Sequence, residues 1–77
     1  MNNIKYFCRT IGKNIKRKRI SMGITIKELS KTAGYNEMTL YIIEEGKKYP
    51  RIQTLVDIAD SLNCDVFDFF NKLDRKK

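Results

Sequence analysis

The apolar residues in the middle of the chain follow helical spacing in two short segments separated by a glycine. Leu29 and Ala33 lie four residues apart, and Leu40 and Ile43 lie three apart, so each pair shares one face of a helix. Gly34 lies between the two pairs and supplies the left-handed conformation that ends a helix. The pattern therefore predicts two short helices joined by a tight turn.

Capping residues mark the start of each of these helices. Thr25 is followed three residues later by Glu28, and in such a capping box each side chain satisfies a backbone N–H at the helix start. Asn36 is a typical N-cap for the second helix. Two capped helices around a short turn form a helix-turn-helix pattern, here over residues 25–45.

A longer helix is predicted before this pair, over about Tyr6–Met22, and Gly23 ends it. Its buried stripe is expected to comprise Phe7, Ile11, Ile15 and Met22, which lie at helical spacing. The basic side chains of this segment lie mostly off that stripe, where they can follow a phosphate backbone from the flank. Residues 1–5 are expected to form a frayed lead-in.

Two further helices are predicted after Gly46. Pro50 favours an extended residue before it and marks the start of a helix over about Ile52–Leu62. The buried positions of that helix are expected to be Leu55, Ile58, Ala59 and Leu62. Asp65 and Asp68 then open a short fifth helix, which contains Val66, Phe67, Phe69 and Phe70. Apart from a charged tail at 74–77, the sequence predicts an all-α fold of five helices.

Length and composition predict one small domain over residues 1–77, because 77 residues with 42% hydrophobic content bury little surface. Cys8 and Cys64 are the only cysteines and histidine is absent, so neither a zinc finger nor a disulfide framework can be assembled. Both cysteines are expected to be small core side chains in a reducing compartment. No apolar run is long enough for a signal peptide or a membrane span, so the cytoplasm is the expected location.

An enzyme is poorly supported by the same inventory. Acid–base or nucleophilic chemistry lacks histidine, paired acids and a phosphate-binding glycine loop. We therefore expect no catalytic residues, no cofactor, no metal and no small-molecule ligand.

The positive charge is concentrated in the first two-thirds of the chain. Net charge is +7, and residues 1–51 hold 12 Lys/Arg against 4 Asp/Glu, while residues 52–77 hold 4 against 5. A basic run alone is typical of a solvated surface, and a membrane surface is a weaker alternative because the apolar residues around it are needed for a core. Because the charge coincides with a helix-turn-helix pattern, it favours DNA as the partner.

The residues at fixed spacing across this region resemble the lambda-repressor-like (Cro/CI, XRE) DNA-binding family. The matching positions are Ile15, Arg19, Gly23, Leu29, Ser30, Gly34, Leu40, Ile43, Glu44 and Gly46. The resemblance covers about residues 10–70 and extends to small stand-alone members such as restriction–modification controller proteins. It implies a five-helix DNA-binding domain in which Arg19 and Glu44 form a structural ion pair, since a partly buried charge persists chiefly when paired.

In this family the outward face of the second helix of the pair reads DNA bases in the major groove. With Leu40 and Ile43 facing inward, the candidate base-reading residues are Glu37, Met38, Thr39, Tyr41 and Ile42. Relatives often carry glutamine, arginine, asparagine or serine at positions 37, 38 and 42. This chain has Glu, Met and Ile there instead, so bidentate recognition of purines is not available from these positions. Contacts of Met38 and Ile42 with thymine methyls, and of Glu37 with cytosine, imply A·T-rich sites with some cytosine. Thr39 or Tyr41 can hydrogen-bond to a phosphate or to a base edge.

Phosphate contacts are expected on both sides of this face. The loop after the second helix carries Lys47, Lys48 and Arg51, where relatives contact the DNA backbone. On the other side are Asn36 and the start of the first helix of the pair, where Thr25, Ile26 and Lys27 offer backbone N–H groups. Relatives often have a phosphate-contacting glutamine at position 26, which is isoleucine here.

The phenylalanines near the C-terminus suggest a homodimer. A short helix cannot bury Phe67, Phe69 and Phe70 together in so small a domain, so part of this group is expected at a dimer interface, although all three completing the monomer core is the alternative. A two-fold dimer would bind a near-palindromic operator in double-stranded DNA, with half-sites about 34 Å apart. The sequence thus predicts a transcriptional regulator with autoregulation as a family inference. The alternative is a protein-interaction module, such as an antitoxin or an adaptor.

Overall fold

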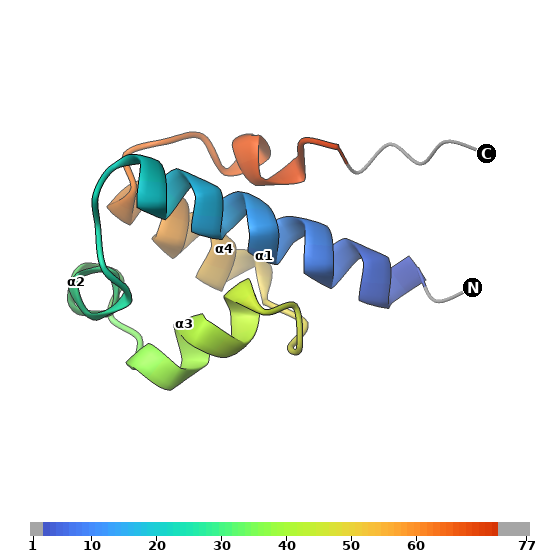
Figure 1. The fold of residues 1–77 in the computed structure, drawn as a ribbon, viewed down its shortest axis with the longest axis horizontal. Coiled ribbons are helices and arrows are strands. Elements are labelled where there is room, and N and C mark those ends of the chain that lie inside the picture. Colours follow the sequence, from blue (N-terminus) through green and yellow to red (C-terminus); the bar gives the residue numbers. More distant parts are fainter. Residues whose placement is uncertain (1–2, 73–77) are drawn as a thin grey trace.

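The computed structural model describes residues 3–72, and these residues form only helices and their connections (Figure 1). Four are α-helices and the last is a 3₁₀ helix. The elements in chain order are α1 (Asn3–Ser21), α2 (Ile26–Ala33), α3 (Glu37–Glu44), α4 (Ile52–Ser61) and η1 (Val66–Phe70).

The long helix α1 lies between two parts of the chain that are distant in sequence. It packs against η1 on one side and against α3 on the other (Figure 1). Helix α2 packs against α3 and α4, and α4 also contacts η1. This arrangement leaves the outer side of α3 open to solvent.

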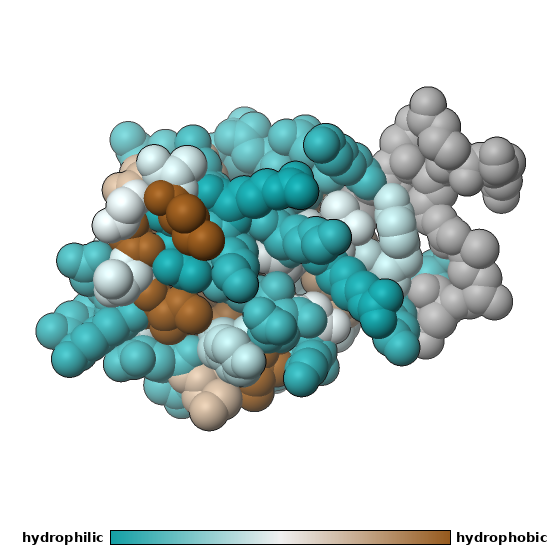
Figure 2. All heavy atoms as spheres, viewed as in Figure 1, coloured by the Kyte–Doolittle hydropathy of each residue, from teal (hydrophilic) through white to brown (hydrophobic). Residues whose placement is uncertain are grey.

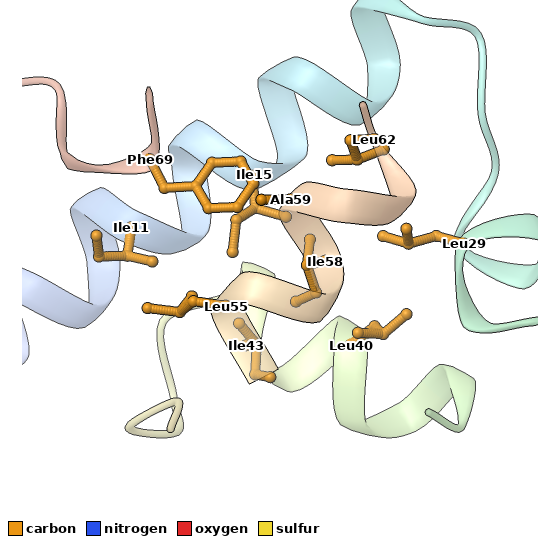
Figure 3. Close-up of a cluster of buried hydrophobic side chains, with 10 residues drawn as sticks. All are labelled: Ile11, Ile15, Leu29, Leu40, Ile43, Leu55, Ile58, Ala59, Leu62 and Phe69. Atoms are coloured by element: carbon orange, nitrogen blue, oxygen red, sulfur yellow. The ribbon is translucent and has the colours of Figure 1, made fainter. Parts of the chain in front are cut away.

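Every element contributes to one hydrophobic core (Figure 3). Its buried members are Ile11, Ile15, Leu29, Leu40, Ile43, Leu55, Ile58, Ala59, Leu62 and Phe69. The stripes predicted for α1 and α4 therefore face inward, with one exception. Met22 is 42% exposed, because α1 ends at Ser21 and Gly23 turns the chain away with a φ of 69°.

The caps of α2 and the N-cap of α3 form through local interactions that the sequence predicts. Thr25 and Glu28 make a reciprocal capping box, and Gly34 ends α2 in the left-handed conformation with a φ of 82°. The Thr39 N–H donates to Asn36 Oδ1 at 2.7 Å at the start of α3. Helix α3 is thereby held at a defined angle after only two residues of connection beyond Gly34.

A glycine sets the distance between α1 and α3. A methyl group on Gly12 would lie 2.5 Å from the Glu44 carbonyl oxygen and would also strike the Ile43 carbonyl oxygen. Only a residue without a side chain fits this crossing. The C-terminal end of α3 therefore sits directly on the backbone of α1.

Two expectations about the ends of the chain were wrong. Helix α1 begins at Asn3, so residues 3–5 are helical, while residues 1–2 and the charged tail at 74–77 lie outside the described residues. The fifth element is a 3₁₀ helix rather than an α-helix. Asn14 of α1 donates from Nδ2 to the carbonyl oxygens of Phe69 and Asn71, each at 2.8 Å, and so closes this element after a single short run.

The three phenylalanines have different environments. Phe69 is 1% exposed and belongs to the core, so its assignment to a dimer interface was wrong. Its ring fills the space that α1 and α4 leave under η1 (Figure 3). Phe70 is half-buried and Phe67 is 72% exposed. Only these two remain candidates for contact with a second subunit.

Candidate nucleic-acid interface

The outward side of α3 carries an apolar row with an acid beside it. Met38 is 63% exposed and Tyr41 is 47% exposed, while Ile42 is half-buried and Glu37 is exposed at the first turn. These side chains stand opposite the inward residues of the same helix, as the helical spacing predicts. A row of this kind can make van der Waals contacts with base edges, and Tyr41 adds a hydroxyl.

Thr39 belongs to a different surface from the other candidate base-reading residues. It is half-buried and lines a hollow together with Lys48, Pro50 and Arg51 of the α3–α4 loop. The side chain therefore faces the basic loop rather than the centre of the outward row. A phosphate contact fits this position better than a base contact.

The start of α2 presents backbone N–H groups, but fewer than the sequence suggested. The Thr25 N–H donates to Glu28 Oε1 at 2.9 Å, and the Thr25 hydroxyl oxygen accepts from the Glu28 N–H at 3.0 Å. The first N–H groups of a helix have no carbonyl partner in a preceding turn, so those of Ile26 and Lys27 are the ones available to an anion.

The apolar residue at position 26 has a packing explanation. The Ile26 side chain is half-buried and packs against the core cluster. A polar side chain here would reach a phosphate, whereas isoleucine packs against the core and offers only its backbone N–H as a hydrogen-bond donor. The Asn36 side-chain oxygen is likewise used to cap α3, so its amide nitrogen is the group that can contact a phosphate.

The loop between α3 and α4 holds exposed cations on a constrained backbone. Lys47, Lys48 and Arg51 are all exposed, while Pro50 is buried among them. Gly46 begins the loop with a φ of 73°, and a methyl group there would lie 2.8 Å from the Cα of Arg9. The loop is therefore pressed against α1, and its cations have a defined position relative to α3.

Arg19 and Glu44 form a buried ion pair behind this surface. Arg19 Nε donates to Glu44 Oε2 at 2.7 Å, Nη2 donates to Oε1 at 2.9 Å, and Nη1 donates to the Ile24 carbonyl at 2.8 Å. The hydrogen bond to Glu44 raises the pKa of Arg19, with burial opposing it and the charge of Glu44 adding to it. The pair ties α3 to α1 and to the connection that leads into α2.

The acidic and cysteine side chains of the described residues do not gather into a metal site. Among residues 3–72, no group of three or more His, Cys, Asp or Glu side chains could hold a metal ion. Burial raises the pKa of the Cys8 and Cys64 thiols, which favours the protonated thiol over the nucleophilic thiolate. No helix in this part of the protein is both long enough and apolar enough to span a bilayer.

The sequence matches Cro/C1-type helix-turn-helix (HTH) DNA-binding domains over residues 14–71. The chain belongs to this family. The match confirms the resemblance drawn from the spaced residues, and the family consists of DNA-binding regulators of transcription rather than enzymes. An HTH-type transcriptional regulator of Sinorhizobium fredii, y4dJ, is 30% identical over 54 residues, which is 70% of each chain.

Solved structures of regulators share this fold. The restriction–modification controller protein C.AhdI from Aeromonas hydrophila superposes with a TM-score of 0.80 at 16% identity, covering 82% of this chain and 96% of that one. The clp gene regulator ClgR from Corynebacterium glutamicum gives 0.83 at 21% identity, covering 87% and 71%. An HTH_3 family transcriptional regulator from Vibrio cholerae also gives 0.83, at 27% identity, but this chain spans only 40% of it.

Proposed function

We propose that this protein is a sequence-specific transcriptional regulator that binds a near-palindromic operator as a homodimer. In this proposal α2 and α3 form the helix-turn-helix, and α3 enters the major groove of double-stranded DNA. The homodimer, the operator and the roles of individual residues go beyond what family membership establishes.

The observation that carries the proposal is that anion-binding groups precede and follow the outward row of α3 in the chain. The N–H groups of Ile26 and Lys27 lie before it in the chain, and Lys47, Lys48 and Arg51 follow it. Cations and helix N-termini bind phosphates without regard to sequence, whereas the row between them would face the bases. A helix that reads the major groove requires both kinds of contact, one to position it and one to select the sequence.

The side chains of the row favour particular bases. Met38 and Ile42 can pack against thymine methyl groups, and the Glu37 carboxylate can accept from a cytosine amino group. None of these side chains can make the bidentate hydrogen bonds by which Arg, Asn or Gln recognises a purine. We therefore expect A·T-rich half-sites that contain a cytosine.

A row of aromatic rings supports a two-fold dimer. Tyr49, Phe7, Phe70 and Phe67 follow one another with ring centroids 6.1, 5.9 and 6.3 Å apart. The two ends of the row, Tyr49 and Phe67, are exposed. Burying exposed aromatic surface against a second copy is favourable, and a dimer would place two α3 helices on successive major-groove faces, about 34 Å apart.

In vitro selection from a pool of random duplexes tests this function. We expect enrichment of a two-fold symmetric sequence whose half-sites lie about one helical turn apart, bound at least ~10³-fold more tightly than shuffled DNA. Met38→Ala should change which bases are selected, whereas Lys48→Ala should weaken binding to all sequences. A pool that shows no enriched sequence after repeated rounds would refute a sequence-specific regulator.

Autoregulation is the simplest circuit for such a regulator, and it is tested separately. DNA from upstream of the protein's own gene should contain the selected sequence and bind with the same preference over a shuffled duplex. Absence of the selected sequence there would refute autoregulation and leave operator binding intact.

The exposure of Met38 and Tyr41 also favours a second candidate, in which α3 binds another protein as in an antitoxin or an adaptor. Exposed apolar side chains often mark protein contacts, and Glu37 and Glu45 beside them repel phosphate. The two functions differ in their salt dependence, because phosphate contacts weaken steeply as salt rises while an apolar protein contact does not.

A further inference from the structure

A row of basic side chains on α1 lies beside the end of α3 and the loop that follows it. Arg9, Lys13 and Lys16 are spaced four and three residues apart, so they share one face of the helix. All three line one hollow together with Glu44 and Glu45.

Arg9 joins this hollow to a neighbouring one. The second hollow is lined by Arg9 together with Lys47, Lys48 and Tyr49 of the α3–α4 loop. The two hollows therefore form one continuous surface, which we call the basic groove and define by Arg9, Lys13, Lys16, Lys47 and Lys48. Long hydrophilic side chains cover α1 on the face seen in Figure 2.

The acids that line the groove do not cancel its charge. Glu44 is buried and already paired with Arg19. Lys16 Nζ lies 3.8 Å from Glu45 Oε2, so the one exposed acid among the lining residues has a cation beside it. Arg9, Lys13, Lys47 and Lys48 remain as a net positive surface next to the outward row of α3.

Part of this groove lies before the first residue of the family match. The family match begins at residue 14, whereas α1 begins at Asn3. Arg9 and Lys13 therefore lie just before the matched segment, on the N-terminal half of α1. The close contact of Gly46 with the backbone of Arg9 holds the α3–α4 loop against these turns.

The shape of the groove fits a phosphate backbone rather than a small anion. Arg9 and Lys16 are separated by seven residues of helix, which is about 10 Å along the axis. Both hollows are open at the surface, and the cations of α1 are spread in a row along them. A duplex strand offers one phosphate per ~3.4 Å of helix axis, so several phosphates can lie along such a row.

We propose that the basic groove is a second contact surface for the DNA backbone, which extends the grip of the Lys47–Lys48 loop along the N-terminal half of α1. This inference rests on the proposed DNA-binding function, and it assigns Arg9 and Lys13 as phosphate-contacting residues. They contribute affinity for any duplex and do not select its sequence.

The test compares two variants that lose the same charge from different faces of α1. Arg9→Gln/Lys13→Gln removes the groove cations, and Arg17→Gln/Lys18→Gln removes one arginine and one lysine that line a separate hollow with Asp68 on the η1 side. Thermal unfolding followed by circular dichroism checks that both variants fold. Fluorescence anisotropy then gives the affinity of each protein for the selected operator and for a shuffled duplex across a salt series.

We expect Arg9→Gln/Lys13→Gln to lower the slope of log affinity against log salt by ~1.8, since each phosphate contact contributes ~0.9. With isotherms that converge at ~1 M salt, this corresponds to about 60-fold weaker binding at ~0.1 M. The change should be the same on both duplexes, and the control variant should keep the wild-type slope. Equal slopes for both variants and the wild type, or equal losses in both variants, would overturn the proposal.

Failure of the groove and failure of the proposed function give different results. If the wild-type protein prefers the selected operator and the salt slope of Arg9→Gln/Lys13→Gln is unchanged, the groove proposal is refuted and the proposed regulator stands. If the wild-type protein has no sequence preference, the proposed regulator is refuted, and the salt slope on the shuffled duplex still decides whether the groove contacts DNA.

Discussion

The buried pair of Arg19 and Glu44 gives the sharpest stability prediction. Their side chains are 10% and 2% exposed, and Arg19 makes three hydrogen bonds, of which two go to Glu44. Replacing either residue by methionine leaves the other charge buried without its partner. Replacing both removes the two charges together and fills similar volume.

The expected magnitudes follow from this geometry. Removing one partner of a buried pair costs about 3–5 kcal/mol, whereas replacing the whole pair with apolar side chains is often close to neutral. A chain of this length is stabilised by only about 4–12 kcal/mol in total, at ~0.05–0.15 kcal/mol per residue. Each single variant should therefore lose a large fraction of its stability, and the double variant should recover most of it.

Urea unfolding followed by circular dichroism measures these differences. The wild type, Arg19→Met, Glu44→Met and the double variant form a double-mutant cycle, and a fixed concentration of trimethylamine N-oxide keeps the weakest variants folded without urea. The coupling free energy should be at least about 3 kcal/mol. Because the hydrogen bond raises the pKa of Arg19, its contribution persists below the ordinary arginine pKa and is lost only as pH rises through the raised value.

Two results would contradict this account. Additive losses in the double variant would show that the two side chains stabilise the fold independently. Single variants that each lose less than about 1 kcal/mol would show that the pair is not held in a desolvated setting. Either result would also refute the role of the pair in holding α3 against α1 and against the α1–α2 connection at Ile24.

Three further predictions follow from packing and exposure. Gly12→Ala should destabilise the fold by about 3 kcal/mol in urea unfolding, because the added methyl group clashes with backbone carbonyls of α3. Alanine stabilises a helix that has no such neighbour, so a gain of stability would show that α1 and α3 can separate. Phe69→Ala should lose about 3–5 kcal/mol, whereas Phe67→Ala should leave monomer stability within about 0.5 kcal/mol and weaken self-association in sedimentation equilibrium; equal losses of stability would contradict the assignment of Phe69 to the core and Phe67 to the surface. Ellman's reagent should modify the half-buried Cys64 before the buried Cys8, and both more slowly than in urea; the reverse order would contradict the burial of Cys8.

The local features of the fold were predictable because each depends on residues close together in the chain. The capping box of Thr25 and Glu28, the left-handed Gly34 and the Asn36 cap all lie where the sequence indicated. The inward positions of Leu40 and Ile43 follow from helical spacing in the same way. The family resemblance added the Arg19–Glu44 register, which spacing alone does not give.

The candidate interface could be predicted only in part. Exposure of Met38, Lys47 and Lys48 follows from helix phase and from a loop rich in charge. The turning of Thr39 toward the loop and the packing of Ile26 against the core depend on neighbours from other elements, and no local signal announces them. The place of Arg9 beside the loop is equally non-local, because it depends on the close contact with Gly46.

By itself, the sequence determined where the α2–α3 pair begins and turns, which of its helical positions face inward, and where the positive charge is concentrated, because caps, glycines and periodicity act within a few residues. Only the tertiary structure decided which phenylalanine is buried, why η1 is a 3₁₀ helix, and how closely α1 approaches α3. These outcomes depend on the volume left between elements and on long-range hydrogen bonds. Asn14, for example, donates to the carbonyl oxygens of Phe69 and Asn71, which lie 55 and 57 positions further along the chain. Competition for a shared core is settled by all the elements together, so no single segment of the sequence contains the answer.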